Sequence, residues 1–279
     1  MRGVRVFLAL LVTMTLPAPA AESGLRVVGG AGAITETIYA LGAQDRLVAV
    51  DMSSVYPSEA RKLPQVGYTR QLAAEGILSV QPTLLLINDD AGPPTALSQI
   101  EKAGVKIVRL PNDHTPEAAE ERIRAIGQEL GRTEQARQLI ARLHAEIRAV
   151  RARAEGAGTH PKVLFIYARG GGVMNVAGRR TAADSIIALA GGRNAVEGYE
   201  GYKPLTAEAA AGAAPDVILV TSRGLETSGG VDELLKQPGL SLTPAGKARR
   251  VIAMDDLLLL GFGPRLGQAA KDLCDQLHP

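Results

Sequence analysis

The chain has 279 residues, and its 31 Lys and Arg against 29 Asp and Glu leave a formal net charge of +2. Because no basic tract is interleaved with aromatic residues, this near balance argues against a nucleic-acid partner. Cys274 is the one cysteine in the sequence, so an internal disulfide is excluded, and a chain of this length can build its core without one.

Residues 1–20 have the pattern of an export signal. Two arginines come first, residues 6–16 form an apolar run, and the tripeptide APA at 18–20 fits a cleavage site. The run is too short for a permanent transmembrane helix, and no later segment approaches about 18 uninterrupted apolar residues. No cysteine stands at the cleavage site to carry a lipid. We therefore expect a soluble protein in the periplasm, cleaved near Ala20.

Residues 21–114 alternate short β-rich runs with helical stretches and are assigned to an N-terminal α/β lobe. Such alternation is typical of a mostly parallel sheet covered by helices. The predicted strands are 26–28, 47–50, 83–87 and 105–110, and the clearest helix is 33–41.

Residues 115–157 change to a helical spacing of apolar residues. Thr115 and Pro116 make a good helix start, because Thr caps and Pro suits the first helical position. The segment around Gly131 offers a break. From about residue 133 the helix is long and highly charged, which indicates a rigid helical backbone between two bodies.

The alternation resumes in residues 158–279, which are assigned to a C-terminal α/β lobe. Strands are predicted at 162–167, 216–220 and 250–253, with a helix at 182–189. The expected fold is therefore α/β: two Rossmann-like lobes with mostly parallel sheets, joined by one long backbone helix. A ligand cleft is expected between the lobes, at the carboxyl ends of the strands.

An internal repeat supports the prediction of two similar lobes. In each half a short helical segment with a glutamate is followed, at the same spacing, by a proline and a buried strand. The generic alternative is ordinary helix–strand patterning, but the equal spacing favours a repeat. The paired segments are 72–75 with 82–87, 205–208 with 215–220, and TETIYALG (35–42) echoed by ADSIIALAG (183–191).

The sequence offers little catalytic chemistry. It has no G-x-S-x-G nucleophile motif and no phosphate-binding G-x-x-x-x-G-K-[ST]. It also lacks His and Cys at zinc-ligand spacing, and its four histidines do not follow core strands. Asp89 and Asp90 either bind a cation or a polar ligand or cap the next helix, and the cap is favoured. We therefore predict a binding protein and not an enzyme.

Tyrosines and arginines gather at predicted loop positions. Arg provides a planar fork for carboxylates, and Tyr provides a flat face with an oxygen donor, so together they suit a planar, anionic, partly apolar ligand. Ordinary loop packing is the alternative for any single tyrosine. The residues concerned are Tyr56, Tyr68, Arg70, Arg169, Tyr199, Tyr202 and Arg265.

Six segments carry a family resemblance, and VGYTRQLAAEGIL within 63–86 is the most specific of them. On these segments the chain resembles the periplasmic haem-binding proteins of Gram-negative haem importers, within the two-lobed binding proteins that have a single helical backbone. The resemblance covers essentially all of the chain after the signal. The segments are 26–42, 63–86, 90–110, 181–196, 202–209 and 261–265.

The resemblance implies that Tyr68 is the axial ligand of ferric haem, since phenolate oxygen suits Fe(III). Arg70 either favours the phenolate or pairs with a haem propionate. Some relatives place a histidine ligand where this chain has Arg169, so we expect five-coordinate iron, with Arg169 near the open face or a propionate. Tyr56 is the second choice for the ligand. Tyr202 and Arg265 complete the candidate haem contacts.

The resemblance also implies partners. In this class one acidic residue on each lobe meets arginines of the permease, and Glu75 and Glu208 match those positions; each also suits the first turn of a helix. The expected partners are a dimeric ABC permease and, upstream, an outer-membrane haem uptake system. The alternative functions are binding of a corrinoid or ferric siderophore and, ranked lower, a periplasmic enzyme acting on a tetrapyrrole.

Overall fold

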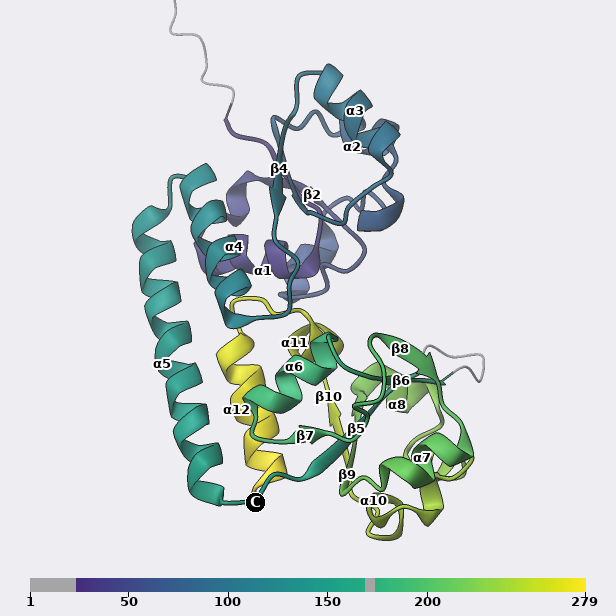
Figure 1. Cartoon of the computed structure of the whole chain (residues 1–279). Coiled ribbons are helices and arrows are strands. Elements are labelled where there is room, and N and C mark those ends of the chain that lie inside the picture. The colour runs from purple at the N-terminus through teal and green to yellow at the C-terminus, as the bar shows by residue number, and fades with distance from the viewer. Residues whose placement is uncertain (1–23, 169–173) are drawn as a thin grey trace, which may run out of the picture.

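The computed structural model describes residues 24–168 and 174–279, which form two lobes with one long helix, α5, running past both (Figure 1). The N-terminal lobe has a four-stranded sheet in the order β2-β1-β3-β4, and every neighbouring pair is parallel. Its strands are β1 Val27–Gly29, β2 Leu47–Val50, β3 Leu84–Asn88 and β4 Lys106–Leu110.

Helices cover both faces of this sheet. All five residues of β3 are buried, and the side chains of the first four alternate between two hydrophobic clusters. Leu84 and Leu86 belong to the cluster that includes the first helix, whereas Leu85 and Ile87 belong to the cluster that includes the next two. These helices are α1 Gly32–Ala40, α2 Ala74–Ser79 and α3 Pro94–Lys102.

The predicted helical region forms two helices, α4 Pro116–Glu129 and α5 Thr133–Ala157. The Thr115 hydroxyl accepts a hydrogen bond from the Ala118 amide, as expected for a cap. The break between them contains Gly131 at φ +59°, a conformation that favours glycine. Within the described part of the chain, no helix is both long and apolar enough to cross a membrane.

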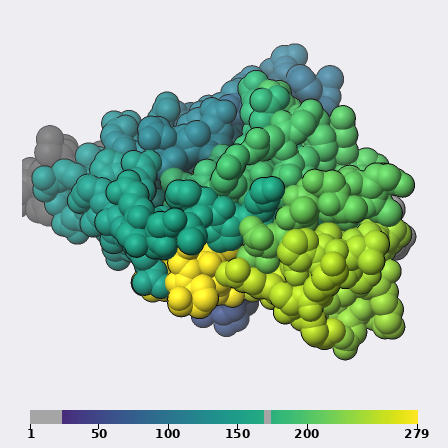
Figure 2. Space-filling view, turned by 60° about the horizontal axis from the view of Figure 1, so that its bottom comes forward, coloured from purple at the N-terminus to yellow at the C-terminus, as the bar shows by residue number. Residues whose placement is uncertain are grey.

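The backbone helix α5 contacts both halves of the molecule. Its buried residues recur every three or four positions, and they face α4 and the last helix of the chain, α12 Leu266–Leu277. Figure 2 shows the teal of α5 beside the yellow of α12. At about 1.5 Å per residue, 25 residues span roughly 37 Å, enough to reach from one lobe to the other.

The C-terminal lobe has a mixed sheet in the order β10-β9-β5-β6-β8, with β7 paired to β5. β5, β9 and β10 are parallel, but β6 and β8 are antiparallel additions that the sequence reasoning missed. β5 ends at residue 168 and β6 begins at 174, which is too short a connection for the crossover that parallel pairing requires. The strands are β5 Lys162–Ala168, β6 Met174–Ala177, β7 Arg193–Asn194, β8 Tyr202–Pro204, β9 Val217–Thr221 and β10 Val251–Met254.

The helices of this lobe lie around the sheet, with α6 and α11 toward the N-terminal lobe in Figure 1. Their bounds are α6 Ala182–Leu189, α7 Ala207–Ala213, α8 Ser222–Thr227, α9 Val231–Leu235, α10 Pro244–Lys247 and α11 Asp256–Leu260.

The two halves of the proposed repeat have matching local structure. α2 precedes β3, and α7 precedes β9. In each half the residue directly before the proline has a positive φ: Gln81 at 48° and Ala214 at 42°. The halves differ at the helix start, because the Thr206 hydroxyl caps α7 whereas Ala73 gives α2 no side-chain cap.

Candidate functional site

The carboxyl ends of β2 and β3 carry two loops that are tied together. The Met52 amide donates to the Gly67 carbonyl at 3.0 Å, so the segment after β2 returns to the strand that it left. The Leu72 amide donates to the Gly92 carbonyl at 2.8 Å, which joins this segment to the loop after β3. In parallel α/β sheets this edge is where ligands usually bind.

Tyr68 lies on this edge with its side chain exposed at 40%. Gly67 precedes it at φ +93°, and a short 3-10 helix, Thr69–Gln71, follows it. The Arg70 guanidinium donates to the Tyr68 phenol oxygen through Nη1 at 3.2 Å. An accessible phenol oxygen with a cationic donor beside it is equipped to act as an anionic ligand.

Asp90 holds Arg70 in place. Arg70 donates to Asp90 Oδ2 through Nε at 2.8 Å and Nη2 at 2.5 Å, and this bonding raises the pKa of Arg70. The predicted cap role of Asp89 and Asp90 is wrong, because α3 starts after Pro93 without a side-chain cap. Asp90 is therefore part of the Tyr68 cluster, which the sequence did not reveal.

Tyr56 and Arg265 lie together in a second group. The Arg265 guanidinium carbon is 3.6 Å from the centre of the Tyr56 ring, and Arg265 Nε donates to Glu36 Oε1 at 2.5 Å. An open cavity of about 370 Å³ lies beside them, lined also by Leu139 of α5. Among the described residues, no hydrogen bond or ring contact joins this group to Tyr68.

The C-terminal lobe presents a third aromatic group. Tyr167, near the end of β5, and Tyr202, at the start of β8, have ring centres 5.9 Å apart, and Tyr202 is 43% exposed. Tyr199 is more enclosed: its hydroxyl donates to the Val176 carbonyl at 3.1 Å. Arg169, expected near the haem, lies outside the described residues.

One exposed apolar side chain lies beside the Tyr68 segment. Met52 is 59% exposed although it follows a buried strand. The hydrogen bond from its amide to the Gly67 carbonyl places its backbone beside the Tyr68 segment. Sequence reasoning missed Met52, and its place two residues after the predicted strand 47–50 was the available signal. The described exposed large hydrophobic residues are Met52, Tyr56, Tyr68, Tyr202 and Leu242.

Glu75 and Glu208 occupy matching places, one on each lobe. Each is exposed in the first turn of its helix, α2 or α7. Bonding to its own backbone amide and to the Thr206 side chain lowers the pKa of Glu208. Both carboxylates are available to a partner, and both also suit the positive end of a helix.

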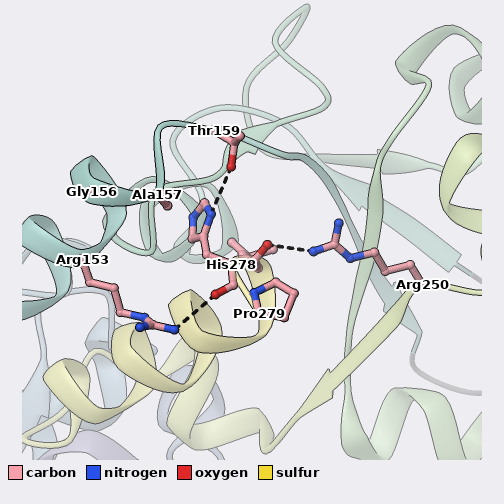
Figure 3. A pocket seen from close by; sticks show the side chains of 8 residues that line it. Arg153, Gly156, Ala157, Thr159, Arg250, His278 and Pro279 are labelled. Carbon is pink, nitrogen blue, oxygen red and sulfur yellow. Dashed lines mark hydrogen bonds between the residues drawn. The ribbon is translucent and has the colours of Figure 1, made fainter.

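Another cavity, of about 510 Å³, lies at the far end of α5 and is a place of structural contacts (Figure 3). There Arg153 donates to the His278 carbonyl at 3.2 Å, and Arg250 donates to the Leu277 carbonyl at 2.7 Å. These bonds satisfy carbonyls that α12 leaves free at its end. Within residues 24–168 and 174–279, no cluster of three His, Cys, Asp or Glu is arranged to hold a metal ion.

Comparisons with known proteins place the chain in a family. The periplasmic heme-binding protein RhuT from Roseiflexus sp. RS-1, in apo form, is 48% identical with a TM-score of 0.88, over 91% of this chain and 98% of its own. The heme-binding protein HutB of Vibrio cholerae is 39% identical with a TM-score of 0.84, over 92% of this chain and 100% of its own.

A vitamin B12-binding protein of Yersinia pestis is 28% identical over 271 residues, which covers 96% of this chain and 90% of that protein. The family model described as periplasmic binding protein matches residues 27–258. The match spans most of both lobes and the backbone helix. This chain therefore belongs to the periplasmic binding protein family.

Proposed function

We propose that the protein binds ferric haem between its lobes and delivers it to an ABC permease. The observation that carries the proposal is the Tyr68 phenol, exposed at the ligand edge of the N-terminal sheet and hydrogen-bonded by Arg70. The heme-binding proteins of Roseiflexus and Vibrio cholerae, similar over nearly their whole length, support it.

In this proposal Tyr68 supplies the axial oxygen to the iron of the transported haem, because phenolate is a hard anionic donor suited to Fe(III). Arg70 stabilises the negative charge on that oxygen, and Asp90 keeps the guanidinium in the bonding orientation. The iron is five-coordinate, since an arginine at position 169 does not replace a histidine ligand.

The remaining contacts differ in what they offer the haem. Tyr202 presents an exposed ring from the other lobe, and Arg169 would meet the open face or a propionate. Tyr56 offers a side chain that is 45% exposed, with Arg265 over its ring. Arg265 is the weakest of the candidates, because Glu36 and the Tyr56 ring already engage its guanidinium.

Membership of the family supports export to the periplasm and a role as the binding component of an ABC transporter. Glu75 and Glu208 would dock onto the permease, one from each lobe. An outer-membrane uptake system would supply the haem. The function is carriage and not catalysis, in keeping with the solute-binding family.

Corrinoid binding is the second candidate, favoured by the vitamin B12-binding relative. Cobalamin already carries its own axial ligands and needs no protein phenolate, so Tyr68 and Arg70 would have no role in binding it. A ferric siderophore would use the same lobes, but no described cluster is specific to one.

Titration with haemin distinguishes the candidates. We expect the wild-type protein to shift the haemin Soret band and to give a ferric phenolate charge-transfer band, and Tyr68→Phe to lose that band and bind at least tenfold more weakly. Tyr199→Phe is the matched control, since that hydroxyl bonds within its own lobe. A Tyr68→Phe spectrum identical to wild type would contradict Tyr68 ligation, and tight cobalamin binding without a haemin shift would favour the corrinoid.

A further inference from the structure

The stretch of chain made of most of α11 and the loop before α12 joins the two lobes independently of α5. We call residues 257–265 the interlobe segment. In Figure 1 it is the yellow stretch that runs along the N-terminal lobe. Leu257 packs against α1 so closely that a Cβ on Gly32 would lie 2.7 Å from Leu257 Cδ1.

Two buried polar contacts tie this segment to the N-terminal lobe. The side chain of Arg122 in α4, which is 2% exposed, donates to the Phe262 carbonyl at 2.5 Å and to the Pro111 carbonyl at 2.5 Å. Glu36 in α1, 4% exposed, forms an ion pair with Arg265. A buried charge without a partner is strongly destabilising, so moving the segment away from either contact would cost free energy.

The segment is shaped to admit the Glu36 carboxylate. A Cβ on Gly263 would lie 2.6 Å from Glu36 Oε2, so a larger residue would displace that oxygen. On its other side the Arg265 guanidinium stacks on Tyr56, at the start of the loop that leads to Tyr68. Glu36, Arg265 and Tyr56 thus connect α1, the interlobe segment and the ligand-edge loop.

The repeat gives an internal comparison. Asp184 in α6 stands where Glu36 stands in α1, in the echoed segments 183–191 and 35–42. Asp184 accepts hydrogen bonds from the Arg180 amide at 3.0 Å and the Asn194 side chain at 3.0 Å, both within its own lobe. The contact across the lobes is therefore specific to Glu36 and is not a requirement of this kind of helix.

We propose that Glu36 and Arg265 are a positioning pair that fixes the separation of the two lobes, and with it the width of the binding site between them. The backbone helix sets the direction along which the lobes are arranged. The Glu36–Arg265 pair and the Arg122 contacts form a second connection between the lobes, in addition to α5, so that the lobes cannot rotate about α5. The proposal does not depend on which ligand binds.

The distance between the lobes can be measured directly by pulsed electron spin resonance. Spin labels go on Gln99→Cys in α3 and Glu226→Cys in α8, both exposed, with the buried Cys274 replaced by Ala. At pH 8 and without ligand we expect a narrow distance distribution for the otherwise wild-type protein. Arg265→Ala should broaden it, and Arg265→Lys, which keeps the charge, should restore most of the narrowness.

A matched control distinguishes the positioning role from a general contribution to stability. Asp184→Ala removes the repeat-related carboxylate and should lower thermal stability without changing the distance distribution. Gly263→Ala keeps every charge and displaces only the Glu36 carboxylate, so it should shift the distance even if Arg265→Ala fails to fold. An unchanged distribution in Gly263→Ala, or in a folded Arg265→Ala, would overturn the proposal.

Haemin titration of the same variants tests the consequence for the site. We expect at least tenfold weaker binding in Arg265→Ala and wild-type binding in Arg249→Ala, whose exposed ion pair with Asp232 lies within one lobe. Unchanged affinity despite altered lobe spacing would contradict the positioning role. If the wild-type protein does not bind haemin, the proposed cargo fails while the distance result still decides the lobe spacing.

Discussion

At the scale of single residues, the candidate site depends on polar pairs whose members are far apart in the sequence. Arg70 meets Asp90, 20 residues away, and Arg265 meets Glu36, 229 residues away. The sequence suggested Tyr68 and Arg70 through one compact motif. It could not supply their partners, because a charged residue reveals its partner only once the chain has brought the two together.

Asp90 should affect haem binding only through Arg70. Without the Asp90 carboxylate, in Asp90→Ala, the Arg70 guanidinium is free to move away from the Tyr68 oxygen. We expect haemin affinity to fall about fivefold, which corresponds to the net contribution of one ordinary hydrogen bond, about 1 kcal/mol. Because the ion pair is largely exposed, stability should change by less than about 1 kcal/mol.

A double-mutant cycle checks this route. In an Arg70→Ala background, Asp90→Ala should cost no further affinity. A full fivefold loss in that background would show that Asp90 acts on the haem by another route.

Glu36 makes stability depend on pH. Burial raises the pKa of Glu36 from 4.5 to about 7; Arg265 opposes this shift and Asp255 adds to it. The folded state therefore holds the proton more tightly than the unfolded state, so the contribution of Glu36 is present below about pH 4.5 and is lost as pH rises through about 7. The free energy of unfolding should fall over this range by about 2 to 3 kcal/mol on account of Glu36.

Urea unfolding between pH 5 and pH 8 measures the effect. Glu36→Gln keeps an acceptor for Arg265 but has no proton to lose, so its stability should fall less than that of the wild type over this range. Parallel pH profiles for the two proteins would show that Glu36 does not titrate in this window. Burial also raises the pKa of Asp51, and comparison of the two proteins cancels that contribution.

At the scale of elements, the local sequence predicted helices and strands correctly where apolar residues recur with a clear helical or strand periodicity. The strand at 47–50 and the helix at 182–189 form at the predicted residues. The antiparallel strand β8, Tyr202–Pro204, was missed because it is a short, exposed edge strand without apolar alternation. β6 was missed because it has only four residues, although it is mostly buried. Thr115 caps α4, as the sequence predicted, whereas α2 begins without a side-chain cap.

The buried stripe of α5 should carry most of its contribution to stability. Leu143 is fully buried, so Leu143→Ala should cost about 2 to 5 kcal/mol through lost contacts and a cavity. Arg148, exposed on the same helix, is the control, and Arg148→Ala should change stability by less than about 0.5 kcal/mol. Chemical denaturation measures both, and similar losses would mean that α5 is not held by this stripe.

At the scale of the whole molecule, each lobe presents one exposed glutamate in the first turn of a helix, Glu75 in α2 and Glu208 in α7. If Glu75 and Glu208 dock onto permease arginines, Glu75→Lys with Glu208→Lys should reduce haem transfer to the reconstituted transporter at least tenfold. Haemin affinity should stay within twofold of wild type, because neither residue belongs to the Tyr68 cluster.

The control for that experiment reverses two other exposed carboxylates, Glu134 and Glu233, each in an ion pair with a residue three positions further along the chain. Transfer by this control should match the wild type. Equal transfer by the Glu75/Glu208 variant and the wild type would exclude the docking role.

The sequence by itself determined the two α/β lobes and the helical region between them, because apolar periodicity and turn residues act over short stretches of chain. It suggested the segment that carries Tyr68 only through a family resemblance. The tertiary structure decided that Asp90 bonds to Arg70 and does not cap a helix, and that Glu36 reaches Arg265 in the interlobe segment. These pairs form only once the folded chain has brought distant residues together, and a local sequence pattern contains no information about that arrangement.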